Sequence, residues 1–165
     1  MLSVLTLDLA LPDGEKIGYV GGGADSVGTW LKRMGLDVTE LDSTALSGDL
    51  SAFTTIVIGI FAFGTRPDLA AVTKKLHRFV EDGGHLVTLY HRPSDGWSPE
   101  ATPPLYLRIG SPSLRWRVTN PDADVEILAP DHPLLTGPNP IAADDWAGWH
   151  KERGLYFAAE WDGAY

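Results

Sequence analysis

Apolar and polar residues follow two different periods along the first ninety residues. Five short apolar runs are predicted as strands, and they cover residues 3–9, 16–20, 37–42, 55–60 and 85–90. In two other stretches apolar residues recur every three or four positions, which predicts helices at about 25–35 and 67–82. Strands that alternate with helices in this way indicate a parallel sheet with helices on both faces.

The helix predicted over 67–82 has the clearest boundaries. Thr65 and Asp68 can accept hydrogen bonds from the free N–H groups of its first turn, and Pro67 costs no hydrogen bond there. Gly83 and Gly84 end it. The strands before and after this helix therefore form a right-handed parallel crossover.

The pattern changes after Tyr90. Residues 92–113 contain several prolines and little periodicity. Beyond them, short strands are predicted over 114–118, 124–128 and 154–161, and one or two helical turns over 143–150. We therefore predict one domain, 1–165, with a regular α/β part over 1–91 and an irregular part, rich in proline and tryptophan, over 92–165.

Composition narrows the classes of function. The net charge of −9 argues against a nucleic-acid partner. The chain has no cysteine, which removes disulfides, thiolate metal sites and a cysteine nucleophile. No apolar stretch approaches the ~20 residues that cross a membrane, and no signal peptide is recognisable, so we predict a cytoplasmic protein without membrane contact.

A glycine-rich loop, 21–26, separates the strand at 16–20 from the following helix, where a phosphate-binding loop would lie. However, Ser26 replaces the third glycine of a dinucleotide fingerprint, and Asp25 would place a carboxylate beside the pyrophosphate. The simpler interpretation is a tight turn in which Asp25 complements the helix dipole. We therefore predict no cofactor.

The strand at 85–90 is expected to be buried, and the segment after it could form a sharp turn that holds a nucleophile. Ser94 only half-matches the Gly-x-Ser-x-Gly pattern, because Arg92 stands at the first glycine. His91 is the candidate for catalysis, and a polar loop histidine is the alternative. The pairs Asp131–His132 and His150–Glu152 lack a metal-binding pattern, so capping or surface roles are expected and no metal is predicted.

Ligands of parallel sheets bind at the carboxyl ends of the strands, which places loops 21–23, 61–66 and 90–92 together. The predicted ligand-binding residues are Gly22, Gly23, Phe61, Arg66, Tyr90, His91 and Arg92. The two arginines favour an anionic or polyhydroxyl ligand, although Arg66 could instead bind a loop carbonyl or an acid.

The aromatic residues near the C-terminus admit two interpretations. They could form a sugar-stacking surface or a small satellite core, and they are Trp146, Trp149, Tyr156, Phe157 and Trp161.

Several strings of residues resemble a known family. The early strings are Ile58-Gly59, Arg66–Leu69, Phe79–Gly84 and Leu86–Tyr90. The late ones are Asp131–Leu135, Pro138-Asn139, Asp144–Trp149, Glu152–Phe157 and Trp161-Asp162. Together they resemble the class I glutamine amidotransferase-like domain found C-terminally in large LmbE-related (PIG-L family) proteins, and more distantly the ThuA-like group.

The resemblance implies a flavodoxin-like three-layer α/β sandwich with a mostly parallel sheet. The family domain continues past the position of Trp161, so the chain is expected to be truncated at its C-terminus. The amidotransferase cysteine is absent, and so is the Pro-His-x-Asp-Asp zinc motif of LmbE-type deacetylases. The resemblance therefore implies a non-catalytic domain that binds a small polar or carbohydrate ligand, or that assists an LmbE-like carbohydrate deacetylase.

Two alternatives stay open. The chain could be a small hydrolase or sugar-processing enzyme that uses His91 with a carboxylate such as Glu160 or Asp131. It could also be an oligomerisation module, because missing final strands would leave a sheet edge open. The open edge makes a homodimer the expected assembly.

Overall fold

The computed structural model describes residues 8–147 and 154–165 and divides the chain into two compact units. The larger, here called the sheet unit, comprises Gly14–Arg117 and Gly154–Tyr165. The smaller, here called the connecting unit, comprises Met1–Asp13 and Val118–Arg153. The single domain expected over 1–165 stays a prediction.

A four-stranded parallel sheet forms the centre of the sheet unit. Its strands are β1 (Lys16–Val20), β2 (Asp37–Glu40), β3 (Thr55–Ile58) and β4 (His85–Thr88). They lie in the order β2-β1-β3-β4, and every neighbouring pair is parallel. This order is consistent with a flavodoxin-like α/β fold, so the predicted parallel sheet is confirmed.

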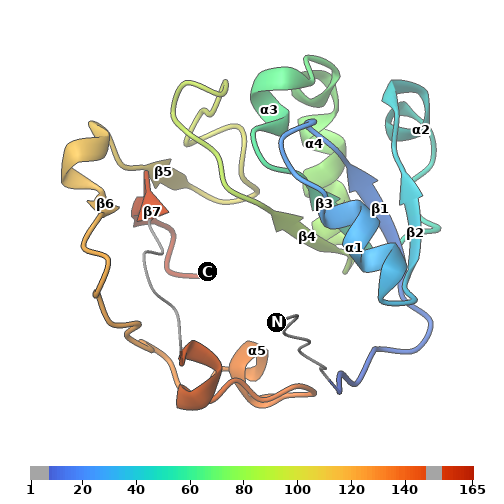
Figure 1. Cartoon of the computed structure of the whole chain (residues 1–165). Helices are drawn as coiled ribbons and strands as arrows, with labels where there is room; N and C mark the ends of the chain where they lie inside the picture. The colour runs from blue at the N-terminus through green and yellow to red at the C-terminus, as the bar shows by residue number, and fades with distance from the viewer. Residues whose placement is uncertain (1–7, 148–153) are drawn as a thin grey trace. The chain divides into compact units, whose positions relative to one another are not determined.

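Helices cover both faces of this sheet. Figure 1 shows α1 (Val27–Arg33) in front of the sheet and α4 (Asp68–Glu81) behind it. The first turn of α4 carries Asp68, and Leu69, Leu76 and Phe79 on its inner face are buried, as the periodicity predicts. Two shorter helices, α2 (Ser43–Ser47) and α3 (Ala62–Thr65), follow β2 and β3.

Side chains of successive strand residues point to opposite faces, which divides the core in two. On the α1 face, Ile17, Tyr19 and Val57 are buried. The larger cluster, on the α4 face, joins strand residues such as Val20, Ile56 and Ile58 to Leu46 and Leu69 from the helices.

β4 is the last strand of the sheet and is largely exposed, in contrast to the buried strand expected at 85–90. Among the described residues it pairs only with β3, and the side chain of Val87 is 45% exposed. Val87 is the register neighbour of the buried Val57, but it is not part of the cluster that Val57 forms with Val27 and Leu31 of α1. The expectation of a buried strand at 85–90 is therefore wrong.

The Pro-rich part of the sheet unit adds an antiparallel pair. β5 (Leu107–Ile109) pairs with β8 (Ala158–Trp161), and Arg108 faces Glu160 across the ladder at 3.0 Å. The strand predicted over 154–161 is interrupted between β7 (Gly154–Leu155) and β8 by Tyr156, whose φ is +56°.

The region after β5 departs from two predicted strands. The strand predicted over 114–118 is replaced by η1 (Ser113–Arg115) and β6 (Arg117–Val118), which pairs with β7. The strand predicted over 124–128 is wrong, because its alternating apolar residues are exposed and have no partner strand in the described chain.

The connecting unit contains α5 (Pro133–Thr136) and η2 (Ala143–Trp146). Asn139 binds both backbone groups of Ala10, at 2.8 and 2.9 Å. The turns predicted over 143–150 are confirmed as far as Trp146. The remaining residues with predictions there, Trp149, His150 and Glu152, lie outside the described residues, as does most of the strand predicted over 3–9.

Candidate functional site

The three predicted ligand-binding loops meet at the carboxyl edge of the sheet. The Phe61 N–H donates to the Tyr90 carbonyl at 3.1 Å, and the Thr65 hydroxyl donates to the Gly22 carbonyl at 3.1 Å. These bonds connect the loop after β3 to the loops after β4 and β1, so the edge has a fixed local geometry.

Position 22 requires a glycine, because the loop after β1 closely approaches the loop after β3 there. A Cβ at this position would lie 2.5 Å from the Ile60 carbonyl oxygen and 2.9 Å from the Ala62 nitrogen. Its neighbour Gly23 has φ +78°, in the left-handed region that favours glycine. Both glycines therefore serve the turn itself, and neither contributes a functional side chain.

Asp25 occupies the place where a phosphate would lie in a nucleotide fold. It accepts hydrogen bonds from the Val27 N–H at 2.9 Å, from the Ile60 N–H at 2.7 Å and from the Tyr19 hydroxyl. Burial acts to raise the pKa of Asp25, but these donors hold it below its ordinary value. The Asp25 carboxylate therefore holds the turn together, which is the structural role expected for it at the start of the helix.

Phe61, Tyr90 and Arg92 form a partly exposed surface on this edge, which we call the Tyr90 surface. The rings of Phe61 and Tyr90 meet edge to face with centroids 5.5 Å apart, and the Arg92 guanidinium lies 4.1 Å above the Phe61 ring. Phe61 holds this position with a φ of +59°, a strained conformation for a non-glycine residue.

Arg92 is fixed by a buried carboxylate. Asp95 is 4% exposed, and it accepts hydrogen bonds from Arg92 Nε at 3.1 Å, Nη2 at 2.7 Å and the backbone N–H at 2.7 Å. Burial alone would raise the pKa of Asp95, but these donors lower it. Asp95 is outside the predicted site, and its i,i+3 spacing from Arg92 is the signal that could have suggested it.

His91 is buried behind this surface. Its Nδ1 donates to the Leu89 carbonyl at 2.7 Å, and its Nε2 accepts from the Phe63 N–H at 3.1 Å. The rings of Phe63 and Trp97 pack against it. Burial lowers the pKa of His91, so the ring is neutral and both nitrogens are used for backbone contacts. This arrangement gives no support to proton transfer by His91.

Arg66 lies apart from the Tyr90 surface. Its guanidinium binds Asp68, with Nη2 to Oδ2 at 2.6 Å, and donates twice to the Leu41 carbonyl at 3.2 Å. These are the two kinds of partner expected if Arg66 has a structural role. It connects the start of α4 to the end of β2.

Tyr156 extends the Tyr90 surface and was expected only as part of an aromatic cluster. Burial raises the pKa of Tyr90, and the nearby Tyr156 phenol raises it further. The positive φ of Tyr156 turns the chain between β7 and β8. No sequence pattern predicts that a tyrosine will adopt a positive φ.

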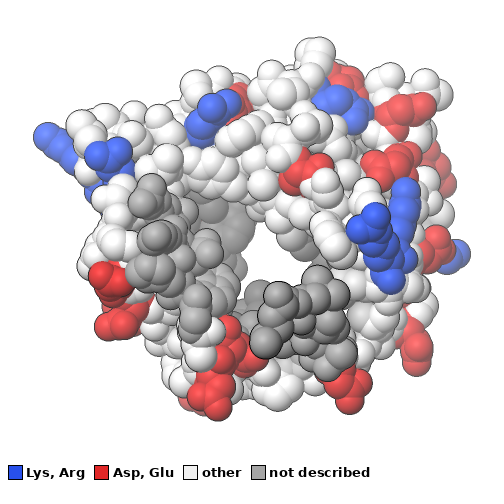
Figure 2. All heavy atoms as spheres, viewed as in Figure 1, with Lys and Arg blue, Asp and Glu red and all other residues white. Residues whose placement is uncertain are grey.

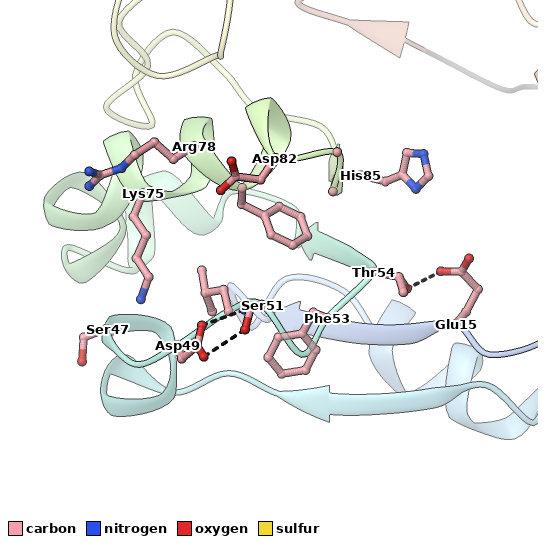
Figure 3. Close-up of a pocket in the computed structure, with 14 residues that line it drawn as sticks. Glu15, Ser47, Asp49, Ser51, Phe53, Thr54, Lys75, Arg78, Asp82 and His85 are labelled. Atoms are coloured by element: carbon pink, nitrogen blue, oxygen red, sulfur yellow. Dashed lines mark hydrogen bonds between the residues drawn. The ribbon is translucent and has the colours of Figure 1, made fainter.

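A separate cleft of about 780 Å³ lies at the opposite, amino edge of the sheet (Figure 3). Its polar groups largely serve the fold. Lys75 donates to the carbonyls of Leu46 and Gly48 at the end of α2, Asp49 binds Ser51, and Glu15 binds Thr54. We therefore place the candidate site at the carboxyl edge despite the size of this cleft.

Charge and metal chemistry add no further candidate. On the face shown in Figure 2, basic and acidic side chains lie in small groups between uncharged areas. In the part of the chain that the structure describes, no His, Asp and Glu residues cluster as a metal site would need, and no helix has the length and apolar character to cross a membrane. His132 caps α5 by accepting from the Leu134 N–H at 3.2 Å, which confirms its expected capping role.

A scan against protein-family models, a search of curated proteins and a search of solved structures each find no match to this chain. The fold is thus known from the chain's own geometry, as an α/β unit with a four-stranded parallel sheet.

Proposed function

We propose that this chain is a non-catalytic, amidotransferase-like domain that binds a carbohydrate or another small polyhydroxyl ligand, and that it assists an LmbE-like carbohydrate deacetylase. One observation carries the proposal. The position after β4, where an amidotransferase holds its nucleophile, is occupied by an exposed tyrosine and a buried histidine with both nitrogens hydrogen-bonded. The edge thus offers an aromatic binding surface but no activated nucleophile.

The chemistry of the Tyr90 surface supports a sugar ligand. Tyr90 is 37% exposed, and its ring is held by Phe61. An aromatic ring offers its face to the C–H groups of a sugar, while the Arg92 guanidinium offers donors to hydroxyl oxygens. The proposed partnership with a deacetylase rests on the family resemblance alone.

Nuclear magnetic resonance of the ¹⁵N-labelled full chain tests the binding. We expect a panel of simple glycosides to shift the amide signals of residues 61 and 90–92. Tyr90→Leu should abolish the shifts, whereas Trp30→Leu, which removes an exposed aromatic residue from α1, should leave them intact. A panel without any shift at these residues would contradict the proposal.

We also expect no release of ammonia from glutamine, because the chain lacks a thiol. A glutaminase assay above the buffer blank, repeated on the Tyr90→Leu variant to exclude a contaminant, would detect such activity. Ammonia release by the natural chain that scales with protein concentration and is lost in Tyr90→Leu would overturn the non-catalytic assignment, whereas equal release by both proteins would indicate a contaminant.

A second candidate function, an oligomerisation module, is favoured by a different observation. β4 ends the sheet with an exposed Val87, in a parallel sheet of the kind that is usually covered on both faces. The two functions are compatible, because the outer edge of β4 and the loops at its carboxyl end are different surfaces.

A further inference from the structure

The guanidinium of Arg92 has one edge in use and one edge open. Asp95 takes Nε and Nη2, while Nη1 has no hydrogen-bond partner among the described residues. The side chain remains 42% exposed, although Asp95 beneath it is buried. The open edge therefore presents Nη1 and the outer hydrogen of Nη2 to solvent.

This open edge is held in place before any ligand arrives. The Phe61 ring supports the guanidinium plane from one side at 4.1 Å, and the buried carboxylate fixes its rotation. Asp95 is itself seated closely, because a Cβ on Gly64 would come within 3.1 Å of the Asp95 backbone. A donor pair that is already ordered loses little conformational entropy on binding.

Two parallel N–H donors on a fixed guanidinium match the two oxygens of a planar carboxylate. The Arg92–Asp95 pair is neutral in sum, so it suits a monoanion better than a doubly charged phosphate. Tyr90, whose ring packs against Phe61 beside it, offers aromatic area and a hydroxyl group. Given the proposed function, on which this step rests, we infer that the Tyr90 surface binds a sugar acid: the carboxylate pairs with the open edge of Arg92, and the sugar ring lies on Tyr90.

The test compares matched sugars on the full chain. Methyl glucuronide has a carboxylate where methyl glucoside has a hydroxymethyl group, and methyl glucoside 6-phosphate carries a phosphate ester on that hydroxymethyl group. We expect the glucuronide to bind about tenfold or more tightly than the glucoside, measured from amide shifts of residues 61 and 90–92.

Arg92→Lys should reduce this preference to about twofold or less, because lysine keeps the charge beside Asp95 but loses the donor fork. Arg108→Lys is the matched control, since Arg108 also pairs with a carboxylate, that of Glu160, and is similarly exposed. It should leave the preference intact. Thermal unfolding of both variants checks that each is folded.

The possible results separate the two proposals. Equal binding of glucuronide and glucoside, or tighter binding of the phosphate, would overturn the sugar-acid assignment while the sugar-binding function stands. Failure of every sugar to bind would overturn both. A preference for the glucuronide that survives in Arg92→Lys would also refute the role of Arg92.

Discussion

At the scale of single residues, the site depends on which polar groups are already satisfied. His91 and Arg66 stand in the sequence where a catalytic base and a ligand-binding cation would stand. In the structure both complete the hydrogen bonds of nearby backbone carbonyls. Arg92 differs, because its buried partner occupies only one edge of the guanidinium.

The buried neutral state of His91 predicts a loss of stability in mild acid. Because its pKa is lowered in the fold, the unfolded chain binds the proton more readily. Stability should be fully present above the unfolded pKa of about 6.5 and fall below it, at up to about 1.4 kcal/mol per pH unit. Urea unfolding at pH 7.5 and 5.5 measures this difference.

A variant that cannot titrate provides the control. His91→Gln should be less stable at pH 7.5, but it should lose less stability than the natural chain on acidification. An unchanged difference between the two pH values in His91→Gln would refute the assignment to His91.

Arg66 should matter for folding and not for binding. Arg66→Met leaves the Leu41 carbonyl without its two donors and removes the partner of Asp68. We expect the free energy of unfolding to fall by about 1–2 kcal/mol. Arg33→Met, at an exposed arginine over Trp30, should change it by less than about 0.5 kcal/mol. Equal unfolding curves for Arg66→Met and the natural chain would contradict the structural role.

At the scale of elements, the periodic segments were predictable and the irregular ones were not. The helix predicted over 67–82 is α4, Asp68–Glu81, because its apolar face and its end signals agree. β5 at Leu107–Ile109 escapes prediction, because it spans only three residues and its partner β8 lies some fifty residues away. A strand is predicted over 124–128 where none forms. Its residues alternate, but they have no partner strand to pair with in the described chain.

The candidate site shows the same limit. The carboxyl ends of β1, β3 and β4 could be placed together from the alternation of strands and helices. The sequence does not reveal which side chains at this edge are left available for a ligand. That depends on hydrogen bonds to the backbone, such as the one that the Phe63 N–H donates to His91. The positive φ angles of Phe61 and Tyr156 were equally hidden.

The contact between the loops after β1 and β3 predicts a specific sensitivity. Gly22→Ala would drive a methyl group against the Ile60 carbonyl and the Ala62 backbone, which cannot move as a side chain could. We expect a loss of about 1–3 kcal/mol in the free energy of unfolding. Gly163→Ala, where an added Cβ meets no atom within 4 Å, should be nearly neutral. Similar stability of the two variants would contradict the close approach.

At the scale of the whole molecule, the two edge strands of the sheet, β2 and β4, differ in how strongly their side chains discourage pairing with another strand. β2 carries Asp37 and Glu40, and Glu40 pairs with Lys32 at 3.3 Å. Charges of this kind discourage another strand from pairing. β4 has the sequence His85-Leu-Val-Thr88, without lysine, proline or acid. The N–H groups of His85 and Leu89 bond to the β3 side, so those of Leu86 and Thr88 point outward.

The outer edge of β4, which pairs with no second strand among the described residues, predicts self-association of the chain. Two copies can pair their β4 strands antiparallel about a two-fold axis at Val87, which joins the sheets and covers the side chain that α1 leaves 45% exposed. The net charge of −9 opposes this only mildly, because salt screens it beyond roughly 8–10 Å. Sedimentation at micromolar concentration should give about twice the 17.9 kDa of the chain. Val87→Lys should give a monomer, whereas Thr39→Lys on β2 should leave the dimer intact. A natural chain that sediments as a single species near 18 kDa would refute the dimer.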